Sequence, residues 1–121
     1  MIFTLFFASK KRKIREYLTR KPEGDKTAFD LLLGDYLDGR LKADLEALGI
    51  TKSEIYVDWS DDMKCIGIQG QCRNHYADIQ IDPDTFSVSF DRDEPDDDTV
   101  YPLTGKEEMY RIISDRIAAL K

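Results

Sequence analysis

The spacing of apolar residues changes at about residue 50 and changes back at about residue 104. In the first and last parts, apolar residues recur every three or four positions, which is typical of amphipathic helices. Between Glu54 and Asp91 they alternate with polar residues, which is typical of strands with one face on a core and the other in water. The order predicts an α+β fold in which helices flank a run of strands.

The first twenty residues are expected to form a helix. A strand through Ile2–Phe7 is the alternative, because a short apolar run does not by itself distinguish the two. The helix is favoured because its period continues to Ile14 and Leu18. Pro22 and Gly24 are then expected to end the element.

A second helical stretch follows, with Asp25 or Thr27 as the expected N-cap. Gly49 is expected to close it in a left-handed conformation. Gly39, within an Asp-Gly pair, leaves open whether the stretch is one helix or two. The apolar stripe consists of Phe29, Leu32, Leu33, Tyr36, Leu37, Leu41, Leu45 and Leu48.

Four segments with a period of two follow one another, separated by short stretches rich in turn residues. Such short connections favour sequential hairpins, so the segments are expected to form a four-stranded antiparallel meander. The segments are Glu54–Trp59, Lys64–Gln69, Tyr76–Ile81 and Phe86–Asp91. Their expected inward positions are Ile55, Val57, Ile66, Ile68, Ile79, Ile81, Val88 and Phe90.

A C-terminal helix is predicted from Thr104 and Glu107, which match the spacing of a capping box. Because only one sheet face is apolar and every helix carries an apolar stripe, the N-terminal helices and the C-terminal helix are expected to pack on that one face. The length of 121 residues suits one domain, residues 1–121. The stripe of this last helix is Met109, Ile112, Ile113, Ile117 and Leu120.

Charge is distributed unevenly along the chain. Residues 1–21 hold seven lysines and arginines and one acid, a net +6, so with −6 overall the remaining hundred residues sum to −12. Six acids against Arg92 lie in Asp91–Asp98. The acidic part repels phosphate, so no nucleic acid is expected as a partner, and a basic protein is. The basic first helix could contact nucleic acid or an anionic membrane surface, but core packing with a basic outer face is the favoured interpretation.

The compartment is expected to be the cytoplasm. The apolar start precedes its basic cluster, which is the reverse order to a secretory signal, and it is too short to span a bilayer. Two cysteines, Cys65 and Cys72, are also fewer than a small secreted domain stapled by disulfides normally carries.

No cofactor and no metal site is expected. Cys65, Cys72 and His75 lack the paired spacing and the fourth ligand of a zinc site. They also lie too far apart along a strand and turn for the two thiols to share an ion or a disulfide. The acidic segment lacks the glycine and glutamate that a calcium loop of the EF-hand type requires, since Asp96 and Pro102 occupy those positions.

Catalysis is not predicted. His75 could act as a general base with Asp78 or Tyr76 nearby in sequence, but these neighbours face the other way, so a partly buried structural histidine is favoured. A hydrolase, with or without a metal ion to assist it, would have to use carboxylates, and the set to test is Asp58, Asp78 and Asp91 on the outward sheet face.

The favoured hypothesis is an acidic protein-binding module, such as an inhibitor or immunity-like protein that masks a basic partner. Two tyrosines on the acidic outward face support it, because tyrosine is enriched at interfaces. Two alternatives remain: the carboxylate hydrolase, and a self-associating domain in which the basic first helix meets the acidic loop of another copy. The expected partner-binding residues are Tyr56, Asp58, Tyr76, Asp78, Asp91, Asp93, Glu94, Asp96, Asp97 and Asp98.

Overall fold

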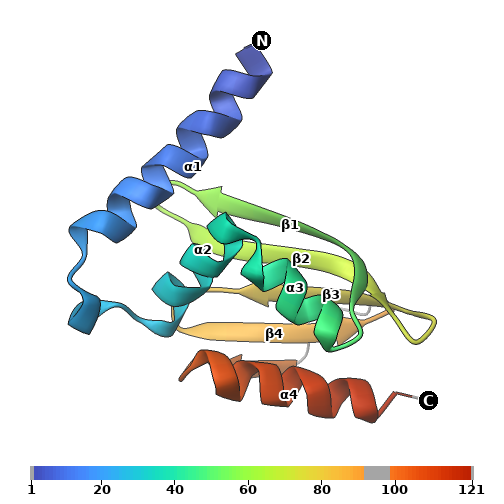
Figure 1. Cartoon of the computed structure of the whole chain (residues 1–121). Coiled ribbons are helices and arrows are strands. Elements are labelled where there is room, and N and C mark those ends of the chain that lie inside the picture. Colours follow the sequence, from blue (N-terminus) through green and yellow to red (C-terminus); the bar gives the residue numbers. More distant parts are fainter. Residues whose placement is uncertain (1, 92–98, 121) are drawn as a thin grey trace.

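An antiparallel sheet organises the protein (Figure 1). The computed structural model describes residues 2–91 and 99–120, and the side chains of residues 10–91 and 99–120. The α+β class and the antiparallel pairing are as the pattern predicts. In chain order the elements are α1 (Ile2–Arg20), a 3₁₀ turn (Glu23–Asp25), α2 (Ala28–Asp38), α3 (Arg40–Ala47), β1 (Thr51–Trp59), β2 (Lys64–Cys72), β3 (His75–Ile81), β4 (Thr85–Phe90), β5 (Val100–Pro102) and α4 (Lys106–Ala118).

Within the described residues the sheet has five strands in the order β1-β2-β3-β4-β5, where the apolar alternation predicts four. The additional strand, β5, pairs Val100 with Ser87 and Tyr101 with Phe86. Three residues are too few to show the period of two that identifies a strand. Pro102 weakens the strand prediction further, since proline within sheets is largely confined to edge strands. Proline is tolerated here because β5 is an edge strand.

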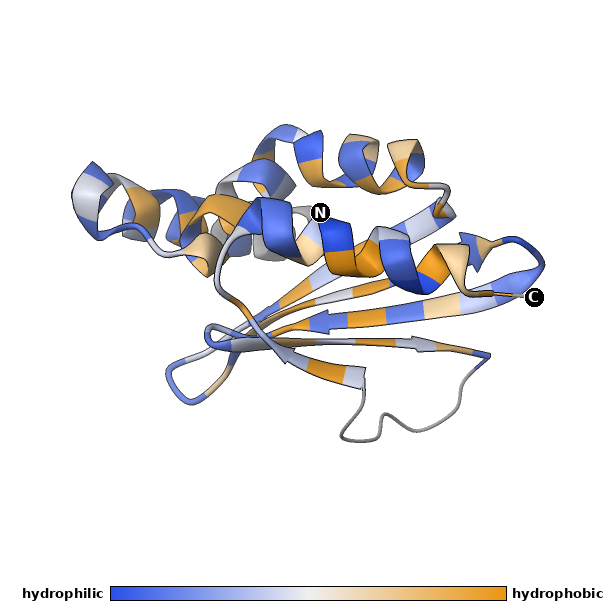
Figure 2. Ribbon diagram, turned by 90° about the horizontal axis from the view of Figure 1, so that it is seen from below, coloured by the Kyte–Doolittle hydropathy of each residue, from blue (hydrophilic) through white to orange (hydrophobic). Residues whose placement is uncertain are grey.

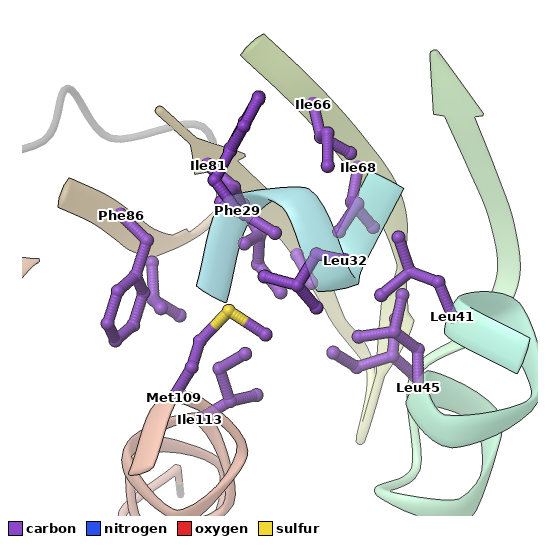
Figure 3. Close-up of a cluster of buried hydrophobic side chains, with 14 of the residues drawn as sticks. Phe29, Leu32, Leu41, Leu45, Ile66, Ile68, Ile81, Phe86, Met109 and Ile113 are labelled. Carbon is purple, nitrogen blue, oxygen red and sulfur yellow. The ribbon is translucent and has the colours of Figure 1, made fainter. Parts of the chain in front are cut away.

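The described helices lie on the same side of the sheet, and none of them lies on the other side (Figure 2). The buried core fills the space between the two layers. Phe29 and Leu32 from α2 meet Ile66 and Ile68 from β2, while α4 contributes Met109 (Figure 3). The one-sided layering follows from the pattern, because a sheet with a single apolar face needs only one helical layer to cover it.

The two central helices begin and separate where the local chemistry requires it. The Thr27 side chain accepts a bond from the Asp30 amide, and the Asp30 carboxylate accepts one from the Thr27 amide, so α2 begins with a reciprocal capping box. Gly39, at φ +83°, divides α2 from α3, which resolves the question that the sequence leaves open. Gly49 adopts φ +103° after α3, the left-handed region expected for it.

The start of α4 differs from the prediction. The capping box of Thr104 and Glu107 does not form; Gly105 occupies the N-cap and makes no side-chain capping bond. The first helical residue, Lys106, instead forms an ion pair of 2.7 Å with Asp35 of α2. A contact between helices therefore fixes this end of α4, and local sequence spacing contains no information about such a contact.

Helix α1 is helical as expected, and its residues 10–20 pack on the rest of the chain. Ile14 is fully buried, and the ammonium of Lys10 donates to the carbonyl of Val57 on the edge strand β1, at 3.0 Å. The first half extends past β1, clear of the other elements (Figure 1). No described helix is both long and apolar enough to cross a bilayer.

Candidate interaction surface

The uncovered face of the sheet is the surface on which the predicted partner-binding residues converge. The pairing register aligns Tyr56 with Gly67, and Glu54 with Gln69 and Asp78. Three of the outward positions that are paired in register hold carboxylates, and none of them holds lysine or arginine. We call this set the outward face: Thr51, Glu54, Tyr56, Asp58, Cys65, Gly67, Gln69, Gln71, Tyr76, Asp78, Gln80, Thr85, Ser87, Ser89, Val100 and Pro102.

Tyr56 lies flat across the neighbouring strand because Gly67 has no side chain. A Cβ atom at Gly67 would lie 2.2 Å from the Tyr56 ring, well inside van der Waals contact. The tyrosine still exposes 47% of its surface, an unusual fraction for a large apolar side chain here. Partial burial, followed by the negative charge of Asp78, raises the pKa of the Tyr56 hydroxyl, which therefore stays protonated and able to donate.

Tyr76 and Asp91 form one corner of the outward face. The Tyr76 hydroxyl donates to the side-chain carbonyl of Gln69 at 2.9 Å. Asp91, at φ +64°, donates its amide to the Tyr76 carbonyl and accepts the Tyr76 amide on its carboxylate. The corner is thus held by backbone bonds, which places the Tyr76 ring in a fixed position.

His75 also bonds to Asp91, with 2.6 Å between Nδ1 and Oδ2. Hydrogen bonding to His75 is the main cause that holds the pKa of Asp91 below its ordinary value. The histidine is partly buried, as expected, but its partner is neither Asp78 nor Tyr76. The contact between His75 and Asp91 could have been found from the predicted strands. When Ile81 pairs with Phe86, the register places Asp91 opposite Tyr76, next to His75.

The three carboxylates considered for a hydrolase are not brought together. Asp58 pairs with Cys65 and Asp78 with Gln69, so they are two strands and four residues apart, roughly 16 Å. Asp91 lies roughly 8 Å from Asp78 by the same geometry. Among the described residues, no three histidine, cysteine, aspartate or glutamate side chains form a group that could hold a metal ion.

The two cysteines are free and buried, and they face opposite sides of β2. Cys65 lies on the outward face with its thiol 3.6 Å from the Asp58 carboxylate. Burial and then the Asp58 charge raise the pKa of Cys65. Cys72, at 2% exposure, packs in the core, and burial raises its pKa as well. Both thiols therefore stay protonated near neutral pH and are poor nucleophiles.

Cys72 pairs with His75 across the β2–β3 hairpin, so a thiol, an imidazole and Asp91 lie close together. A thiol, an imidazole and a carboxylate arranged in this order resemble the nucleophile, the base and the orienting acid of a cysteine-based active site. The buried, protonated state of Cys72 argues against that use, because an activated thiol needs a lowered pKa. We interpret the group as structural.

A cleft of about 590 Å³ lies between α1 and the β1–β2 hairpin, and no spacing in the sequence predicts it. Its floor is aromatic: the rings of Tyr17 and Trp59 meet edge to face at 5.1 Å, and the Lys64 ammonium lies over both. Its rim carries Lys13, Glu16, Arg20 and Asp61. Cations and carboxylates nearly balance, so charge does not select a class of ligand for it.

Four of the expected partner-binding residues, Tyr56, Asp58, Tyr76 and Asp78, share the outward face, and Asp91 lies at its corner. The other five expected residues lie outside the described part of the chain: Asp93, Glu94, Asp96, Asp97 and Asp98. No family model, no curated protein and no solved structure matches this chain.

Proposed function

We propose that this protein is a binding module whose outward face docks a basic protein. The observation that carries the proposal is the joint presence of exposed Tyr56 and three carboxylates, Glu54, Asp58 and Asp78, on a sheet face that none of the described helices covers. None of the three carboxylates forms an ion pair among the described side chains. Its partner would be a basic protein, as an inhibitor or immunity-like role would require. Free thiols suit a reducing compartment such as the cytoplasm.

The composition of the outward face supports this proposal in two ways. Tyrosine supplies a large contact area with little loss of conformational freedom, and Tyr56 is already held against Gly67. Asp58 and Asp78 form no ion pair among the described residues. Their negative potential would speed association with a positively charged surface and disfavour acidic partners.

The alternatives receive less support. The separation of Asp58 from Asp78 does not favour the hydrolase, since carboxylates that share a reacting water or a metal lie much closer than roughly 16 Å. Self-association through the acidic loop stays a prediction, because residues 93–98 lie outside the described part. Sedimentation at low and high salt tests it: a monomer at both would exclude it.

The proposal is tested by affinity capture from a lysate of the cells that encode the protein. The variant carries Tyr56→Ser, Asp58→Asn and Asp78→Asn, all on strand positions that point away from the core. We expect the wild type to retain a basic protein, and the variant to retain at least tenfold less of it, because an aromatic anchor and two charges are lost. Mass spectrometry with quantified peptides gives the readout.

A matched control carries Leu31→Ser, Glu46→Gln and Glu107→Gln, which removes one exposed apolar side chain and two exposed carboxylates from the helical side. It should retain the partner as the wild type does. Equal loss in both variants would mean that charge acts non-specifically, and equal retention in both would contradict the proposal.

A further inference from the structure

Helix α1 differs in composition between its two halves. Residues 2–9 contain no charged residue and five large apolar ones: Ile2, Phe3, Leu5, Phe6 and Phe7. Basic residues begin directly afterwards, and Lys11, Arg12, Lys13 and Arg15 are exposed or nearly so in the packed half. An apolar stretch adjoining a polybasic one is the pair of signals that stable attachment to an anionic membrane surface requires.

The placement of α1 leaves the apolar stretch outside the main body. The helix contacts the body at Lys10, Ile14 and Tyr17, all of which follow the apolar stretch. Residues 2–9 continue the same helix past strand β1, clear of the other elements (Figure 1). Eight helical residues rise about 12 Å, enough to reach the headgroup and acyl boundary and too few to span a bilayer.

The exposed basic residues supply the charge complementarity. Arg12, Lys13 and Arg15 follow the apolar stretch within two turns of the helix. None of the three forms an ion pair among the described side chains. Cations at this position meet phosphate headgroups when the neighbouring apolar residues enter the boundary.

We therefore propose that α1 docks this protein on anionic membrane surfaces, with residues 2–9 in the headgroup and acyl boundary and Arg12, Lys13 and Arg15 on the lipid phosphates. The carboxylates of the outward face do not oppose this contact. The outward face lies on the far side of the sheet from the helices (Figure 2). Salt screens its charge over about 8 Å at physiological ionic strength.

A second copy of the chain is the rival occupant, and outside the stretch itself the described side chains offer it no contiguous apolar counterpart. The exposed large apolar side chains there are dispersed: Leu31 is on α2, Met63 follows β1, and Tyr56 and Val100 lie four strands apart. An apolar stretch of five residues needs a contiguous patch to bury it. A lipid boundary supplies such an environment.

Co-sedimentation with large vesicles tests the proposal. One set is phosphatidylcholine, and the other contains about a third phosphatidylserine, which gives a strong negative surface potential. We expect at least tenfold more protein on the anionic vesicles, and a loss of most of that binding when salt rises from about 0.1 M to about 0.5 M. Equal binding to both sets, or no binding, would overturn the proposal.

Two variants separate the signals. Phe3→Ser, Phe6→Ser and Phe7→Ser remove the apolar one, and Arg12→Gln, Lys13→Gln and Arg15→Gln remove the basic one. Each should reduce anionic binding more than tenfold, because neither signal suffices alone. A matched control removes three exposed positive charges elsewhere, with Arg40→Gln, Lys42→Gln and Lys52→Gln, and should bind within twofold of the wild type.

Sedimentation velocity without lipid identifies the rival occupant. A wild-type dimer that the phenylalanine variant converts to a monomer, combined with vesicle binding that neither variant alters, would assign α1 to a second copy and overturn the proposal. Circular dichroism confirms that each variant is folded. Capture of a basic protein by the outward face is independent of these results, so the two proposals succeed or fail separately.

Discussion

Asp30 connects the N-terminal helix to the rest of the helical layer through one buried carboxylate. It accepts the Tyr17 hydroxyl at 2.7 Å and the Lys21 ammonium at 2.6 Å, and it also caps α2 through the Thr27 amide. Burial raises the pKa of Asp30, but the bonds from Lys21, Thr27 and Tyr17 outweigh burial and keep the pKa below its ordinary value. The position of α1 therefore depends on this carboxylate being charged.

Replacing Asp30 with asparagine should lower the free energy of unfolding by about 2 kcal/mol, because the charge that pairs with Lys21 and one of the two acceptor oxygens are lost. A group whose folded pKa is depressed stabilises the fold above its unfolded pKa, and this contribution disappears as pH falls through the folded pKa. The difference between wild type and variant should thus be constant above about pH 5 and shrink below about pH 4. Urea unfolding measured across this range gives the test; a difference that grows in acid would contradict it.

Residue-level contacts were predictable where the backbone register determines them. The pairing of Tyr76 with Asp91 follows once the two flanking strands are placed, and the bond between His75 and Asp91 depends on that register. Contacts such as Asp30 with Lys21 were not predictable, because nothing in local spacing shows which buried carboxylate a lysine nine residues away will reach.

Helices and long strands were predictable because their apolar periods extend over several turns or alternations. The alternation of Phe86, Val88 and Phe90 identified β4, whereas three residues were too few to identify β5. The start of α4 was misplaced because Lys106 bonds to Asp35, a contact between helices that overrides the capping pattern at Thr104. The break between α2 and α3 was visible as Gly39 but remained undecided, since glycine also occurs inside helices.

Two glycines of these helices should respond in opposite directions to alanine. Gly39→Ala should lower the free energy of unfolding by about 1 kcal/mol, because φ +83° is a left-handed conformation that disfavours a Cβ atom. Gly34→Ala, inside α2 with no atom near its Cβ position, should raise it by about 0.5 to 1 kcal/mol. Thermal unfolding of both variants compares them directly. A stabilised Gly39→Ala would mean that α2 and α3 are not separated at this residue.

At the scale of the whole molecule, the described helices lie on one side of the sheet, and none of them covers the other side (Figure 2). The basic α1 belongs to the helical side together with the acids of α2, α3 and α4, whereas the outward face carries three carboxylates and no lysine or arginine. The uncovered face was predictable, since the strands have one apolar face and the helices only one stripe each. The extension of α1 past the sheet was not predictable. The apolar period of α1 runs without a break from the residues that pack on the sheet into those that extend past it, so the period does not show where packing ends.

The central claim, that the outward face binds a basic protein, is tested most directly by photo-crosslinking inside the cells that encode the chain. A benzophenone amino acid replaces Tyr56, which is exposed on that face, and Leu31, which is similarly exposed on the helical side, serves as the control. We predict a light-dependent adduct with a basic protein at position 56 that is absent at position 31. No adduct at position 56, or the same adduct at both positions, would contradict the claim.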